Sequence, residues 1–165
     1  VTGNRFPDPN DFHIDHKGTL LVGGGIYRPH PPILLKIRRH IAAHPEALIP
    51  RTSLLYGGRA PGPQEQLALG GGRFYVDELR SPAVVGDLAD ALLELLPLDM
   101  SGPLHVGGAD DVSRYDFALL LGADPAAVER AHTTPDRAPN VTLDSSRARA
   151  LLRTRLRGVR EVLGG

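Results

Sequence analysis

The sequence predicts an α/β fold, because short apolar segments alternate with amphipathic helical segments along most of the chain. Three observations support this prediction. Short β-compatible runs end in glycines, helical segments repeat Leu or Ile at helical spacing, and several of those segments begin at Asp or Ser residues suited to capping. No internal repeat is evident.

The amino-terminal part is irregular. Residues 1–32 are rich in Pro, Gly, His and Asp, and within them only Thr19–Val22 has strand character. A helix is expected over Ile33–His44, where isoleucines recur at helical spacing and a proline follows. We therefore divide the chain into an irregular segment, 1–32, and one domain, 33–165.

Three further strand regions are expected in this domain. They are ALIPRTSLLYGG (47–58), GRFYVDE (72–78) and GPLHVGG (102–108). Pro50 argues against a central place in a sheet for the first region, because proline has no N–H to donate to a neighbouring strand.

Helices are expected between and after these strands, each with its own start signal. Asp87 is placed to cap a helix with Leu88, Leu92 and Leu95 on its apolar face. The remaining helix starts are Ser113 before RYDFALLLG, with Asp116 completing a capping box; Asp124–Pro125 in DPAAVERA; Asp144 before SSRARALLR; and GVREVLGG at the end.

Composition excludes several classes of protein. The 19 basic and 19 acidic residues cancel, so nothing indicates a nucleic-acid partner or an anionic membrane surface. The absence of cysteine excludes disulfides and thiolate metal sites, which fits a cytoplasmic protein. No apolar run reaches the roughly 20 residues of a membrane span.

Two patterns in the amino-terminal half resemble ligand sites. The glycines from Gly23 to Gly25 resemble a dinucleotide-binding loop, but Arg28 replaces the third glycine and RPHPP follows where a helix should start. His40 and His44 stand one helical turn apart, and HIDH (13–16) adds further metal-ligand types. Solvated surface histidines explain this pattern better, so no metal site is predicted.

Four motifs from about Ala47 onward occur in the order of a known family. They are RTSLLYGG (51–58), DELRSPAVVGDLADALLELL (77–96), GPLHVGGADDVSRYDFALLL (102–121) and VTLDSSRARALL (141–152). This order resembles the substrate-binding, C-terminal half of extended short-chain dehydrogenases/reductases, in the dTDP-4-dehydrorhamnose reductase-like, sugar-nucleotide-binding branch. The resemblance implies a partial Rossmann-like sheet with the family's small C-terminal substrate-binding subdomain.

The resemblance also implies ligands. Members of the family bind NAD(P) on an amino-terminal Rossmann domain and reduce a keto-sugar carried by a nucleoside diphosphate. By this resemblance Ser53 and Tyr56 would lie near the sugar or the cofactor, and Arg80 would contact a nucleotide phosphate. Purely structural roles remain open: Ser53 as a strand residue, Tyr56 as a packed aromatic, and Arg80 as an ion-pair partner of Asp77 or Glu78.

The family's catalytic Tyr-x-x-x-Lys pair is not found in its expected form. Lys36 lies on the corresponding helix, but Pro32 stands four residues before it and Tyr27 stands nine residues before it. We therefore assign no catalytic residue and no cofactor-binding residue. We interpret the chain as the nucleotide-sugar-binding portion of a reductase that does not catalyse the reaction by itself. The alternative is a non-catalytic regulatory module that associates with a protein partner. Copies of the chain are also expected to be able to associate with one another.

Overall fold

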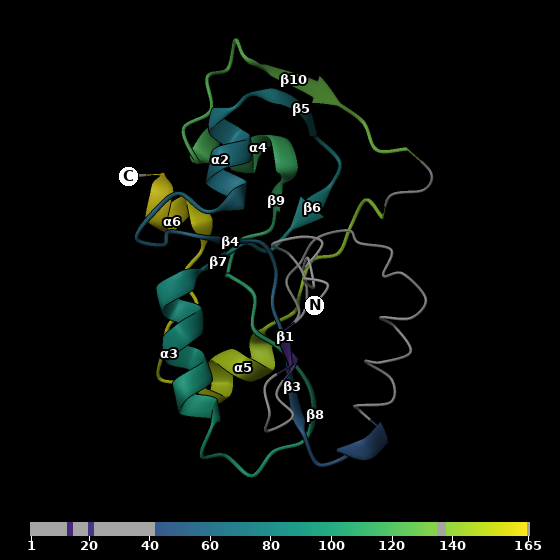
Figure 1. Cartoon of the computed structure of the whole chain (residues 1–165), viewed down its shortest axis with the longest axis vertical. Coiled ribbons are helices and arrows are strands. Elements are labelled where there is room, and N and C mark those ends of the chain that lie inside the picture. Colours follow the sequence, from purple (N-terminus) through teal and green to yellow (C-terminus); the bar gives the residue numbers. More distant parts are fainter. Residues whose placement is uncertain (1–12, 15–19, 22–41, 135–137, 165) are drawn as a thin grey trace, which may run out of the picture.

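The computed structural model describes residues 13–14, 20–21, 42–134 and 138–164 (Figure 1). The expected strand at Thr19–Val22 is described only at β2 (Leu20–Leu21), which pairs antiparallel with β1 (His13–Ile14). The glycine loop, both lysines and most of the helix expected over 33–44 lie outside the described residues.

The described strands form pairs, and most of these pairs are parallel. β3 (Leu48–Arg51) pairs with β8 (Gly102–His105), β4 (Leu55–Tyr56) with β7 (Ala83–Val84), and β5 (Gly72–Tyr75) with β10 (Val128–Ala131), all in parallel. β6 (Leu79–Arg80) and β9 (Val112–Ser113) pair antiparallel. All three strand regions expected within 47–108 are present, and the α/β prediction is confirmed.

Pro50 lies within β3 without breaking its ladder. The carbonyls of Ala47 and Arg51 accept hydrogen bonds from Gly102 and Val106, so alternate residues of β3 face β8. Pro50 therefore turns its nitrogen, which has no hydrogen, away from β8. The proline is tolerated because it removes no bond from this pairing.

The helices within the described residues are short, apart from α3. They are α2 (Pro63–Leu69), α3 (Val85–Leu95), α4 (Arg114–Leu120), α5 (Ser146–Leu151) and α6 (Val159–Leu163). As expected, α3 buries Leu88 and Leu95, and Leu92 packs beside them against β8 and α5. None of the helices in the described parts of the chain could cross a membrane.

Two expected helix starts are confirmed or nearly so. Ser113 caps α4: the Asp116 amide donates to its Oγ (2.9 Å), and the Ser113 hydroxyl donates to the Asp116 carboxylate (2.8 Å). Asp144 accepts from the Ser146 amide (2.9 Å), but Ser145 occupies the cap position, so this prediction is wrong by one residue.

The prediction that Asp87 caps α3 is wrong. The helix begins at Val85, with Val84 at the cap position, so Asp87 lies in its first turn. Its carboxylate accepts instead from Arg157, through the backbone amide (3.0 Å) and the guanidinium (2.7 Å). An acidic side chain in the first turn is still favourable, because it faces the positive end of the helix dipole.

The helix expected over Asp124–Ala131 is also wrong. Asp124 does cap a turn, since its Oδ1 accepts from the Ala126 amide (2.9 Å), but the chain then enters β10. Pairing with β5, far away in the sequence, overrides the local helix signal. The reverse error occurs at Pro63–Leu69, where α2 forms although no helix was expected. Its start signals, Pro63 in the first position and Glu65 two residues later, are visible in retrospect.

The described core divides into three clusters of buried side chains. One lies between α3, β8 and α5, and another lies among α2, β5, α4 and β10. The cluster relevant to the site joins β4, α4 and α6, and its buried members are Leu54, Tyr56, Val84, Val112, Phe117 and Val159. We call it the Tyr56 cluster.

Candidate functional site

The candidate site lies where β3 and β8 end. Parallel strands present their carboxyl ends at the same edge, which is where α/β proteins bind ligands. Thr52 follows β3 and its hydroxyl donates to the carbonyl of Val106, which follows β8 (3.0 Å). One residue later, the Gly107 amide donates to Oγ of Ser145 (2.8 Å), at the start of α5. These bonds fix the loops on either side of Ser53.

Ser53 and Tyr56 share an unusual property. Each is only 1% exposed, and neither Ser53 Oγ nor Tyr56 Oη has a hydrogen-bond partner among the described residues. Buried hydroxyls almost always have a partner, because losing hydration without a replacement bond costs about 1–3 kcal/mol. The segment that the motifs indicated as substrate-binding therefore contains two hydroxyls that bond to no other described residue.

The Tyr56 ring is firmly packed. It meets Phe117 edge-on, with ring centroids 5.5 Å apart, inside the Tyr56 cluster. Burial, and secondarily the negative charge of Asp87, raises the pKa of Tyr56 to about 12. The phenol is therefore protonated near neutral pH and can donate a hydrogen bond, but it is a poor proton acceptor.

The segment containing Arg80 lies beside the Ser53–Tyr56 segment. β7 pairs with β4, and the Ala83 amide donates to the Leu54 carbonyl (2.8 Å). Ser81, the residue after Arg80, donates a hydrogen bond from its hydroxyl to Asp111 (2.6 Å), and its Oγ accepts one from the Leu143 amide (2.9 Å). The topology thus brings the segments of all three predicted residues together, although they come from two distant stretches of sequence.

Arg80 is occupied by partners of its own. It is 1% exposed, and its guanidinium forms an ion pair with Glu78 at 2.5 Å and donates to the Leu79 carbonyl at 2.6 Å. This is the ion-pair role left open by the sequence, with Glu78 rather than Asp77 as partner. Asp77 instead accepts from the backbone and hydroxyl of Thr133 (2.9 Å each). A phosphate contact by Arg80 stays a prediction.

Two carboxylates of α3, Asp87 and Glu94, have structural partners. Asp87, 8% exposed, is held by Arg157, and Glu94 accepts from the backbone of Arg153 and from the amide and hydroxyl of Thr154. Burial alone would raise the pKa of Asp87, but the hydrogen bonds from Arg157 outweigh burial and lower it. These groups join α3 to the C-terminal segment, and each already serves as an acceptor.

The two glycine pairs near the site, Gly57–Gly58 and Gly107–Gly108, do not fit a dinucleotide pyrophosphate. A Cβ at Gly108 would lie 1.9 Å from the Pro82 carbonyl oxygen, so this glycine allows close packing of two loops and leaves no room for phosphate. Asp110 and Asp111 follow it, and their charge would repel a phosphate. Gly57 and Gly58 lead into an extended loop before α2 rather than directly into a helix. Neither pair therefore provides a cradle for the pyrophosphate of NAD(P).

The sequence did not indicate the residues that fix the site loops, Ser81, Ser145 and Asp111. Single serines and aspartates beside glycines are common in loops, so their partners become visible only in three dimensions. Within the described residues, no group of three or more His, Asp or Glu side chains could hold a metal ion. His40, Asp15 and His16 lie outside them.

Comparison with known proteins identifies relatives. No protein-family profile matches the chain. A dTDP-4-dehydrorhamnose reductase of Mycolicibacterium smegmatis is 34% identical over 139 residues, which cover 74% of this chain and 42% of that protein. The chain thus spans less than half the length of this relative.

Solved structures agree. A hypothetical dTDP-4-dehydrorhamnose reductase from Sulfolobus tokodaii superposes with a TM-score of 0.59 at 25% identity, covering 81% of this chain and 55% of that one. A dTDP-4-dehydrorhamnose reductase from Bacillus anthracis, solved with NADP, gives 0.62 at 19% identity, covering 86% and 56%. These matches confirm the family resemblance of the motifs and the Rossmann-like α/β fold.

Proposed function

Because this chain is related to dTDP-4-dehydrorhamnose reductases over part of its length, we propose that it is the nucleotide-sugar-binding portion of such an NAD(P)-dependent oxidoreductase. We further propose that it does not catalyse the reduction by itself. Its ligand is a nucleoside diphosphate sugar, bound at the ends of β3 and β8 by the segment from Ser53 to Tyr56.

The observation that supports this proposal is that two buried hydroxyls on that segment have no hydrogen-bond partner among the residues that the structure describes. A sugar presents many hydroxyl groups, each able to donate and to accept. Ser53 can do both, and the protonated Tyr56 phenol can donate. The cost of burying both groups without partners is offset if a ligand hydroxyl replaces the missing bonds.

The absence of catalysis by this chain alone is proposed on chemical grounds. Reduction of a ketone needs a group that delivers a proton to the carbonyl oxygen as hydride arrives. In the family this is a tyrosine with a lysine one helical turn away. Tyr56 is packed in an apolar cluster with a raised pKa, and the sequence places no lysine near it.

Isothermal titration calorimetry of the purified chain with dTDP-rhamnose tests binding. We expect saturable binding, weakened about fivefold or more by Ser53→Ala and by Tyr56→Phe, because each variant loses a hydrogen bond worth about 1 kcal/mol. Ser101→Ala, an exposed serine outside the site, is the matched control and should leave binding unchanged. No heat with the unaltered chain, or equal affinity in all variants, would contradict the binding proposal.

A turnover assay tests the second part of the proposal. The purified chain, mixed with NADPH and dTDP-4-dehydrorhamnose, should not oxidise NADPH above the rate without protein. Steady NADPH oxidation would show that this chain contains a complete catalytic site.

A regulatory module that associates with a protein partner is the second candidate. Exposed leucines at the end of α3 favour it, since Leu93 is 65% and Leu96 is 69% exposed. A stable complex with another protein, together with no affinity for dTDP-rhamnose, would support this candidate over the first. Association between copies of the chain also stays a prediction, and sedimentation velocity tests it.

A further inference from the structure

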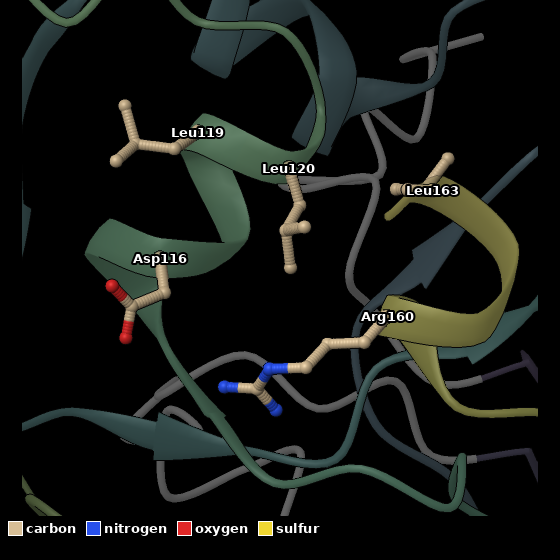
Figure 2. Close-up of a pocket in the computed structure, with 5 residues that line it drawn as sticks. All are labelled: Asp116, Leu119, Leu120, Arg160 and Leu163. Carbon is tan, nitrogen blue, oxygen red and sulfur yellow. The ribbon is translucent and has the colours of Figure 1, made fainter. Parts of the chain in front are cut away.

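A concave surface lies between α4 and α6. It is a pocket of about 400 Å³ (Figure 2), within the range of small-molecule sites. Leu119 and Leu120 line it from α4, and Leu163 lines it from α6. It shares no lining residue with the segments of Ser53, Tyr56 and Arg80.

The pocket combines apolar walls with a single guanidinium. Arg160 extends from α6 into the space below Leu120 (Figure 2). Its backbone amide is fixed by Asp110 (2.8 Å), but its exposed side chain makes no hydrogen bond or ion pair with any described residue. A guanidinium presents paired N–H donors that match the two oxygens of a carboxylate.

Asp116 limits what the pocket can accept. It also lines the pocket, and one of its oxygens is occupied by the Ser113 hydroxyl (2.8 Å). Asp116 and Arg160 both line the pocket and form no ion pair with each other. A carboxylate near Arg160 is attracted, whereas a second negative charge near Asp116 is repelled.

We propose that this pocket binds a small apolar monocarboxylate. The three leucines contact its hydrocarbon body and Arg160 binds its carboxylate. Leu120 and Leu163 also pack against the Tyr56 cluster, so an occupied pocket borders the same packed side chains that hold Tyr56. The inference does not depend on the nucleotide-sugar proposal, because the two sites use different residues.

A pair of probe compounds of matched shape tests the proposal. In ¹H–¹⁵N NMR titrations of the whole chain, 4-methylpentanoate should shift the amide signals of Leu119, Leu120 and Leu163. The neutral 4-methylpentanamide should bind at least tenfold more weakly, because it lacks the charge that Arg160 recognises. Equal binding of acid and amide, or shifts confined to other parts of the chain, would overturn the proposal.

Arginine variants complete the test. Arg160→Gln should reduce binding of the acid to the level of the amide, while Arg147→Gln, an exposed arginine on α5, should leave it unchanged. Arg160 is exposed and its backbone bond to Asp110 remains, so the variant should keep the spectrum of a folded protein. Undiminished binding of the acid by folded Arg160→Gln would refute the role of the guanidinium.

Discussion

Two buried serines near the site allow a direct test of the unpartnered hydroxyl. Ser53 and Ser145 are 1% and 0% exposed, so both are fully enclosed. Ser145 Oγ accepts from the Gly107 amide, whereas Ser53 Oγ has no partner among the described residues. Replacing each with alanine removes the same atom from two sites of equal burial, so only the hydrogen bonding differs.

The two substitutions are expected to change the free energy of unfolding by different amounts. Ser145→Ala leaves the Gly107 amide buried and unpaired, which costs about 1–3 kcal/mol. Ser53→Ala removes a group whose burial already costs a similar amount, so stability should be unchanged or higher by up to about 2 kcal/mol. The difference between the two variants should therefore exceed about 1 kcal/mol.

Urea denaturation followed by circular dichroism measures this difference. With a slope of about 1–3 kcal/mol per molar urea, the two midpoints should differ by roughly 0.3 M or more, with Ser145→Ala lower. If Ser53→Ala lost as much stability as Ser145→Ala, its hydroxyl would have a partner in the free protein. Ser53 would then give no support for a bound ligand.

Two further predictions concern the loops and helices around the site. Gly108→Ala should destabilise the protein by about 3 kcal/mol or more, because the added Cβ would overlap the backbone carbonyl of Pro82. Gly86→Ala, in the first turn of α3 with open space around it, should be neutral or stabilising by up to about 1 kcal/mol. Thermal denaturation compares the two variants, and equal melting temperatures would contradict the close packing at Gly108. Because folding lowers the pKa of Asp87, this carboxylate stabilises the protein above its ordinary pKa of 3.8, and the stabilisation is lost as the pH falls through the folded-state pKa. In urea midpoints measured between pH 6 and pH 3, Asp87→Asn should therefore lose less stability toward acid than the unaltered chain. An unchanged dependence of the midpoint on pH would contradict this prediction.

Sequence patterns correctly predicted the helices that depend on residues only a few positions apart. The leucine spacing of α3 and the Ser113–Asp116 cap of α4 depend on residues within a few positions, and both were found. Asp124–Pro125 provides an equally good local signal, but only one turn forms before Val128–Ala131 pairs with β5. A strand that depends on a partner more than 50 positions away cannot be recognised from its own sequence.

The order of the sequence motifs predicted which segments form the site, but not which partners their side chains have. The motifs pointed to Ser53, Tyr56 and Arg80, and the structure places their segments side by side through β4 and β7. What each side chain does there depends on its partners. The bonds from Ser81 to Asp111 and from Gly107 to Ser145 join residues 30 and 38 positions apart, with no spacing rule that would reveal them.

Arg80 shows why residue type alone is insufficient at such a site. Arginine is the usual choice for a phosphate contact, but it is equally suited to a buried ion pair, and this guanidinium already faces Glu78 and the carbonyl of Leu79. To contact a phosphate, Arg80 would have to give up its ion pair with Glu78, whose side chain is only 3% exposed. Among the described residues Ser53 and Tyr56 have no existing hydrogen bond to give up, so a hydrogen bond to a sugar costs less at these two hydroxyls than at Arg80.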